Sequence, residues 1–286
     1  MKRFIASVGV LAALLVVTPW SAAQQIRSGG PRRTYTPAPG ARDVKAVLFN
    51  WMWYMGMLRG PQENEAVATL ELKATGTMQV DGQPCRLTKY RISNNYQLAG
   101  QRIQIACTRA NGQAYQNVEV VSGQYAWDED IPGAEIVAGK GKATPKANLL
   151  RERMIRLWAS PQGAPKAAAA AKENASVSWD TGKAVVTFPI PGAAGAIAKA
   201  TLSAQNQAEH IEVRDGAVVM TFDYAKYDDY NNPLNKIEAF MPGTMVEKRN
   251  GMTVRDLTTT ETETGNLYVV MPVPASVKKA ASPQSN

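Results

Sequence analysis

The residue types that most often perform catalysis are scarce in this sequence. His210 is the single histidine, and it lies in a strand-like segment, so histidine metal clusters and Ser-His-Asp catalysis have no support unless His210 acts alone. No glycine-rich phosphate-binding loop and no G-x-S-x-G sequence is present. We therefore predict that the protein is not an enzyme and that it uses no metal or other cofactor.

Two acidic clusters beside aromatic residues are the remaining candidates for chemistry. The clusters are Asp128, Glu129 and Asp130 after Trp127, and Asp223, Asp228 and Asp229 among Tyr224, Tyr227 and Tyr230. Paired carboxylates can hydrolyse or bind glycans, and clustered oxygens can hold Ca²⁺. Neither cluster has the spacing of a known calcium loop, so solvated turns are the simpler interpretation. Glycan hydrolysis by Asp128, Asp130 or Asp228 stays open as an alternative.

The two cysteines predict a disulfide. Cys85 and Cys107 are the only thiols, and an even pair in an exported protein is normally oxidised. The segment between them reads as a hairpin with its midpoint near Tyr96, which sets the two cysteines opposite each other. Closing a loop of about 20 residues would stabilise the fold by roughly 3 kcal/mol. A redox role is not indicated, because no C-x-x-C spacing is present.

The first 23 residues have the pattern of a signal peptide. Lys2 and Arg3 precede the apolar run Ile5–Val17, and small residues follow at positions 21–23. The apolar run is too short for a stop-transfer helix. We therefore expect residues 1–23 to be removed, the protein to be periplasmic or secreted, and the mature chain to contain no transmembrane segment.

The formal charge of +8 is concentrated near the ends of the chain. Residues 24–42 are rich in Pro, Gly and Arg and are predicted to be a disordered basic leader, and residues 275–286, with Lys278 and Lys279, a flexible tail. The part between is near neutral, which argues against nucleic acid as a partner. The leader favours a loose attraction to an anionic envelope surface.

An apolar helix is predicted from Asp43 to Gly60. Asp43 can cap its start, and Gly60 followed by Pro61 can end it. Apolar residues occur on all sides, which is typical of a buried helix. A length of about 24 Å and the polar Asn50 at its middle argue against a membrane span. An interfacial helix that exposes one face to lipid is the alternative.

Strands with frequent turns follow this helix. Residues 68–80 alternate between apolar and polar, and Asp81-Gly82, Asn111-Gly112 and Ser122-Gly123 are turn signals, so an antiparallel meander is expected. Helices are predicted at about 148–158 and 165–171. Strands resume at Ser176 and end in a hairpin across Asn250-Gly251, with a further edge strand at 267–273. The predicted class is α+β, with one sheet that covers helices on one side.

This order of elements resembles the periplasmic lipoprotein-localisation carriers of the Lol-type half-barrel family. The matching pieces are MGMLRG, LELKATGTM, SGQYAWDED, RERMIRLWASPQG and the late pattern FDYAKYDD…IEAFMPGTMVEKRNGMTVRDL. The resemblance covers residues 43–274 as a single domain. It implies a strongly curved antiparallel sheet, an incomplete β-barrel of about 11 strands, that wraps the N-terminal helix and one or two further helices. It also implies an apolar pocket for acyl chains.

Methionine and tryptophan side chains on the predicted helices are the candidate pocket residues. Methionine suits pockets for flexible apolar ligands because it is adaptable and polarizable. The candidates are Trp51, Met52, Met55, Met154, Leu157 and Trp158. We expect a carrier or binder of a lipid, a lipoprotein acyl chain or another apolar group. The alternative is an envelope structural or interaction module whose core is filled by these same side chains.

Overall fold

The computed structural model describes residues 35–58, 67–230 and 239–281. The chain divides into residues 1–35 and a compact unit of residues 36–286, and every element below belongs to the second unit. The predicted signal peptide, residues 24–34 of the leader, the predicted helix end at Gly60-Pro61 and residues 282–286 lie outside the described ranges. Among the described residues, no helix is both long enough and apolar enough to cross a membrane.

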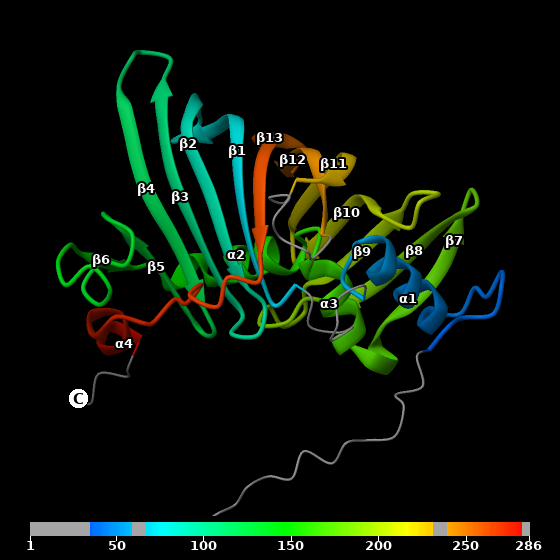
Figure 1. Cartoon of the computed structure of the whole chain (residues 1–286). Helices are drawn as coiled ribbons and strands as arrows, with labels where there is room; N and C mark the ends of the chain where they lie inside the picture. The colour runs from blue at the N-terminus through cyan, green and yellow to red at the C-terminus, as the bar shows by residue number, and fades with distance from the viewer. Residues whose placement is uncertain (1–34, 59–66, 231–238, 282–286) are drawn as a thin grey trace, which may run out of the picture. The chain divides into compact units, whose positions relative to one another are not determined.

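The described part of the chain forms one antiparallel sheet of thirteen strands, which is curved and open (Figure 1). The strands are β1 (Thr69–Val80), β2 (Gln83–Asn95), β3 (Gly100–Arg109), β4 (Ala114–Ser122), β5 (Tyr125–Glu129), β6 (Ala143–Pro145), β7 (Ser176–Asp180), β8 (Lys183–Pro189), β9 (Ile197–Leu202), β10 (Ala208–Asp215), β11 (Val218–Asp229), β12 (Phe240–Arg249) and β13 (Met252–Thr264). Their order is β6-β5-β4-β3-β2-β1-β13-β12-β11-β10-β9-β8-β7. The first and last strands therefore pair at the middle of the sheet.

Helices α2 (Leu150–Trp158) and α3 (Gly163–Ala170) belong to the connection between the two edges of the sheet. The chain leaves the sheet at one edge, β6, and re-enters at the other, β7, so the connection must cross a whole face. It carries a 3₁₀ turn (Ala147–Leu149), α2, α3 and a second 3₁₀ turn (Lys172–Asn174). Helix α2 contacts β3, β4 and β5, and α3 contacts β8. The helices thus cover the face that the sheet needs to bury.

Helix α1 (Val44–Tyr54) is shorter and less buried than the sequence predicts. Its start is as expected, because the Asp43 carboxylate accepts a hydrogen bond from the Ala46 N–H at 3.0 Å. The helix packs on α3 and β7, at the end of the sheet, so only one of its faces is covered. Trp53 and Tyr54 are 41% and 42% exposed. The expectation of burial on all sides is wrong.

The local turn signals are confirmed, whereas the strand count is higher than expected. Asp81-Gly82 and Asn250-Gly251 both adopt positive φ at their two positions, as a two-residue hairpin turn requires. The sheet has thirteen strands instead of about 11, and β6 is one of the shortest of them, with three residues. Strand β11 continues to Asp229. Residues 267–273 form no strand.

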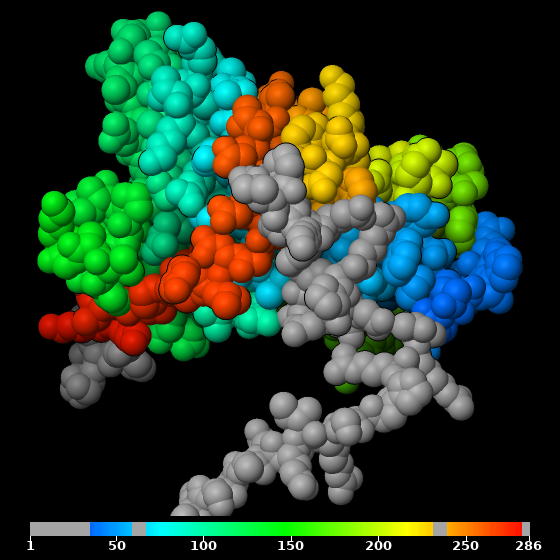
Figure 2. Space-filling model, in the orientation of Figure 1, coloured from blue at the N-terminus to red at the C-terminus, as the bar shows by residue number. Residues whose placement is uncertain are grey.

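The C-terminal segment packs on the sheet through a small second core. Residues 275–281, expected as part of a flexible tail, form helix α4 (Ala275–Ala281), whose Val277 is buried. Figure 2 shows this segment, orange to red, running along the surface after β13. The core beneath it contains Val118, Val120, Trp127, Ala143, Val269, Met271 and Val277. These contacts hold α4 against β5 and β6.

Gly76 allows the close pairing of the two central strands. Its φ is +131°, and a Cβ at this position would overlap the carbonyl oxygen of Asp256 in β13. The pairing of β1 with β2 is interrupted between Lys73 and Thr77, on either side of this glycine. A glycine inside a strand commonly marks a bend or a close backbone approach. Gly76 is therefore a point at which the middle of the sheet can curve.

Strands β2 and β3 carry the predicted disulfide. Cys85 and Cys107 are bonded and buried, with their Cα atoms 5.6 Å apart. Asn95 pairs with Gly100 at the end of the hairpin, so its loop contains Tyr96 as expected. The disulfide prediction is confirmed, and such a bond fits an oxidising, extracytoplasmic compartment.

Candidate ligand-binding pocket

A mainly apolar pocket lies between the middle of the sheet and the helical connection. Its walls come from strands β1, β2, β3, β11, β12 and β13, and its helical side is formed by Arg156 of α2 with Ser160 and Pro161, which follow that helix. The apolar and aromatic lining consists of Leu70, Leu72, Tyr90, Ile92, Phe222, Tyr224, Met241, Met245, Val246 and Leu257. Neighbouring strands thus present alternate side chains to one hollow.

The pocket is narrow in this conformation. Its cavity volume is about 60 Å³, which is room for a few water molecules. Met241 and Met245 are among the lining side chains, and methionine changes rotamer more readily than branched side chains do. An elongated guest would therefore have to displace these side chains or move the helical connection.

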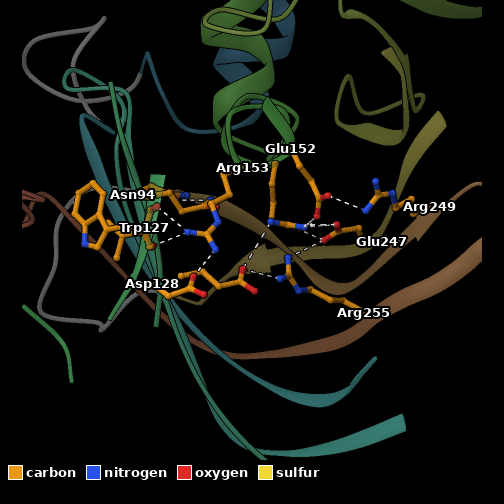
Figure 3. Close-up of polar contacts among 12 residues, drawn as sticks. Asn94, Trp127, Asp128, Glu152, Arg153, Glu247, Arg249 and Arg255 are labelled. Atoms are coloured by element: carbon orange, nitrogen blue, oxygen red, sulfur yellow. Dashed lines mark hydrogen bonds and ion pairs between the residues drawn. The ribbon is translucent and has the colours of Figure 1, made fainter. Parts of the chain in front are cut away.

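One wall of the pocket is a buried ion network centred on Arg156 (Figure 3). The guanidinium of Arg156 donates to Glu247 of β12 through Nε–Oε2 at 3.0 Å and Nη2–Oε1 at 2.9 Å. Glu247 also accepts from Arg255 of β13 at 3.0 Å. Arg255 in turn donates to Glu119 of β4 at 2.8 Å. The network therefore joins α2 to strands from both halves of the sheet, β4 in one half and β12 and β13 in the other.

Glu152 extends this network towards solvent. It accepts from Arg156 one turn further along α2 at 2.9 Å, and from Arg249 at 2.9 Å. The six side chains comprise three arginines and three glutamates, so their formal charges cancel. The groups at this wall of the pocket are therefore polar but carry no net charge. A ligand beside them needs no opposite charge.

The pKa values indicate that this network stays ionised. Burial alone would raise the pKa of Glu247, but Arg156 and Arg255 outweigh it and lower that pKa to about 2. Burial would also raise the pKa of Glu119, which the same two arginines lower below its usual value. Burial raises the pKa of Tyr90 to about 12, so its phenol remains neutral. At neutral pH the wall thus consists of fixed ion pairs and neutral phenols.

A second polar wall consists of a hydrogen-bonded chain of neutral groups. The Gln101 amide donates to the Asn94 carbonyl oxygen at 3.0 Å, and the Asn94 amide donates to the Tyr96 hydroxyl at 3.1 Å. The Tyr96 hydroxyl lies 3.2 Å from Ser160 Oγ, which donates to the Leu157 carbonyl at 2.6 Å. This chain fixes the turn after α2 to the β2–β3 hairpin.

Arg153 fastens the other side of α2 to the sheet. Its guanidinium donates to the carbonyl oxygens of Val120 at 2.9 Å and Trp127 at 2.6 Å, and it pairs with Asp128. Figure 3 shows Arg153 with Trp127 and Asp128, apart from the group that contains Glu152, Glu247, Arg249 and Arg255. Arg153 and Arg156 can therefore be buried, because the sheet supplies partners for both guanidinium groups.

The first acidic cluster has a structural role. Asp128 is paired with Arg153, and the buried Glu129 accepts from the Trp127 indole at 3.0 Å and the Gly133 N–H at 2.7 Å. The interpretation of these two residues as solvated turn residues is wrong. Asp130 is exposed and accepts from two backbone N–H groups.

The second cluster is divided along β11. Asp223 lies 2.6 Å from His210 Nδ1 and 3.0 Å from Lys248 Nζ, in a partly exposed group, whereas the Asp228 carboxylate accepts from the neighbouring Asp229 N–H. His210 lies in β10, as a strand residue. In the described ranges, no three His, Cys, Asp or Glu side chains are placed to hold a metal ion.

Five of the six residues predicted to line a pocket lie in the main core and Met52 packs against it, but none of the six lines the pocket described above. Those on or after the first helix are Trp51, Met52 and Met55, and those on α2 are Met154, Leu157 and Trp158. The Trp51 ring lies 6.4 Å from that of Phe188 in β8, at the end of the sheet. The Trp158 ring lies 6.1 Å from that of Tyr96. Trp51 therefore packs against β8 and Trp158 against the β2–β3 hairpin.

Sequence comparison assigns no family to this chain. No protein-family model matches it, and no significant match to a curated protein was found. Among solved structures, it is similar to a DUF1329 family protein from Desulfovibrio piger, with 6% identity and a TM-score of 0.39. The alignment covers 80% of this chain and 96% of that one. At this level of similarity, no functional argument follows from it.

The pocket-lining strand residues were missed because they are dispersed along the sequence. Leu72 and Leu257, for example, come from the first and last strands, and the pairing of β1 with β13 brings those strands together. The signal that could have identified them is the alternation of apolar residues within each strand. That alternation shows which side chains face inward, but it leaves open which strands are neighbours.

Proposed function

We propose that this protein is a non-enzymatic binder or carrier of a lipid, an acyl chain or another apolar group, which it holds between the sheet and the helical connection. The observation that supports this best is the apolar pocket at the middle of the sheet, with aliphatic and aromatic side chains from five strands. Ligand sites are commonly hollows of this kind, with a few placed polar groups. An exported carrier of this type would serve in the periplasm.

Burial of hydrocarbon would supply the affinity. Each methylene removed from water contributes about 0.8 kcal/mol, so a short acyl segment already binds measurably. The charges of Arg156, Glu247 and Arg255 are satisfied within the ion network, in which Glu119 and Glu152 also take part. A neutral or weakly polar ligand end can therefore lie beside them without breaking an ion pair.

Binding of a whole chain would require the pocket to widen. Rotation of Met241 and Met245 would enlarge it locally. Displacement of the segment Ser160-Pro161, which follows α2, would open its helical side. In this scheme the closed conformation corresponds to the empty protein, and release follows when the helical connection returns to the sheet.

The alternative function is an envelope interaction module with a filled core. One observation favours it: Trp51, Met55, Leu157 and other large side chains on or next to the helices are fully buried in the main core. In such a protein, the narrow pocket would be a packing defect without a ligand.

The two functions can be distinguished with natively purified protein. Organic extracts would be analysed by mass spectrometry for lipid, and a fluorescent fatty acid would be titrated into delipidated protein. The carrier proposal predicts a co-purifying lipid in the extract and saturable binding that unlabelled fatty acid displaces. A clean extract together with the absence of saturable binding would contradict it and favour the interaction module.

A further inference from the structure

The outer side of α1 carries a stripe of a cation and two aromatic rings. Lys45, Phe49 and Trp53 follow one another at a spacing of four residues, which places them on one side of the helix. The rings of Phe49 and Trp53 are stacked, with centroids 6.0 Å apart and an interplanar angle of 14°. Trp53 is exposed although it is one of the most apolar side chains in the helix. Figure 2 shows α1, in blue, at the molecular surface.

The edge strand β7 extends this stripe beyond the start of the helix. Trp179 of β7 is 40% exposed, and the guanidinium of Arg42 lies 3.8 Å from the centre of its ring. Helix α1 packs against the same strand. Arg42, Lys45, Phe49, Trp53 and Trp179 are called the aromatic–basic face below.

The stretch of sequence that leads into this face is basic. Residues 24–45 contain five basic residues (Arg27, Arg32, Arg33, Arg42 and Lys45) against one acidic residue, Asp43. The Asp43 carboxylate caps α1. Tryptophan rings are enriched where a protein meets the headgroup region of a bilayer, and basic residues are attracted to anionic headgroups. Both features occur together on this face and on the chain segment that leads into it.

We propose that the aromatic–basic face binds the surface of an anionic lipid bilayer, with Trp53 and Trp179 inserted among the headgroups. Helix α1 would then lie along the membrane with its buried face still packed on α3 and β7. The proposal does not depend on a ligand in the pocket. In this proposal, Trp53 and Trp179 are exposed because their rings contact the membrane.

The test is co-sedimentation of the purified protein with vesicles of equal parts phosphatidylglycerol and phosphatidylcholine, and with vesicles of phosphatidylcholine alone. Binding is expected to the mixed vesicles and to weaken as salt is added. Replacement of Trp53 or Trp179 by serine is expected to weaken binding to the mixed vesicles by about tenfold each. Both side chains are partly exposed, so the fold should persist, which circular dichroism would check.

Tyr268→Ser is the matched control, because Tyr268 is an exposed aromatic residue on the C-terminal segment. It is expected to bind as the unchanged protein does. The proposal is overturned if the mixed vesicles are not bound, or if Trp53→Ser and Trp179→Ser bind as well as Tyr268→Ser, because the basic leader alone would then account for binding. It is equally overturned if size-exclusion chromatography shows a dimer that Trp53→Ser dissociates, since a second copy would then cover this face.

Discussion

Arg156 of α2 and Glu247 of β12 form an ion pair with two hydrogen bonds, at 3.0 Å and 2.9 Å, between residues 91 positions apart. The pair lies at the wall of the pocket and links helix α2 to the sheet. Both side chains are largely buried, so each would be an uncompensated and destabilising charge without the other. The ion pair should therefore affect both the stability of the fold and its dependence on pH.

Replacement of Arg156 by methionine should destabilise the protein strongly. Glu247 and Glu119 would then share Arg255, and a buried negative charge would lose its main partner. The expected loss is about 3 kcal/mol in the free energy of unfolding, measured by denaturation in urea. Arg249→Met is the control, since that side chain is 47% exposed and its pair with Glu152 should contribute less than about 1 kcal/mol. Equal effects of the two replacements would contradict this role of Arg156.

Acid should weaken the fold through Glu247. Its pKa in the folded protein is about 2, below the ordinary value of 4.5, because Arg156 and Arg255 outweigh the effect of burial. The unfolded state therefore binds the proton more tightly, and the stabilisation is fully present above pH 4.5 and is lost as the pH falls towards 2. Unfolding free energies measured across this range should fall more steeply for the unchanged protein than for Glu247→Gln. Parallel curves would show that Glu247 does not contribute.

Removal of the disulfide should lower stability without changing the fold. Cys85 and Cys107 are 22 positions apart in the sequence, and releasing such a loop costs roughly 3 kcal/mol in the chain-entropy model. The double replacement Cys85→Ala and Cys107→Ala removes the bond and leaves no free thiol in the pair. Thermal and urea unfolding would measure the loss. An unchanged stability would indicate that the β2–β3 hairpin is already constrained in the unfolded chain.

Alanine at Gly76 should be far more damaging than alanine at another glycine with positive φ. A Cβ at position 76 would overlap the backbone of β13 at Asp256, so the pairing of the central strands would have to shift. At Gly82, φ is +75° and no atom lies within 4 Å of an added Cβ, so Gly82→Ala carries the backbone strain alone. We expect Gly82→Ala to cost about 1 kcal/mol and Gly76→Ala several times more. Urea unfolding of both variants would test the comparison.

Sequence patterns predicted the local features well because their causes are local. The turns at Asp81-Gly82 and Asn250-Gly251, the cap at Asp43 and the pairing of the two cysteines each depend on residues within a short stretch of chain or on a single possible partner. The alternation from Leu70 to Val80 likewise gave the inward face of β1.

The features that failed depend on residues far apart in the chain. Glu129 was interpreted as solvated. Its buried carboxylate accepts hydrogen bonds from Gly133 and Trp127, and this arrangement forms only when β5 joins the sheet. Arg153 and Arg156 lie outside the apolar stripe of α2, yet both are buried because strands from both halves of the sheet supply partners. The pocket has the same origin, since no local pattern shows that Leu72 and Leu257 share a wall.

The most direct test of the carrier proposal is a comparison of fatty-acid binding by Met245→Trp and Met252→Trp. Met245 lines the pocket, whereas Met252 is 71% exposed at the β12–β13 hairpin and does not line it. A tryptophan at position 245 would fill the narrow space that the ligand is proposed to enter. The proposal predicts that Met245→Trp weakens saturable binding at least about tenfold while Met252→Trp binds as the unchanged protein does. Equal binding by both variants, with both folded, would contradict the assignment of this pocket as the ligand site.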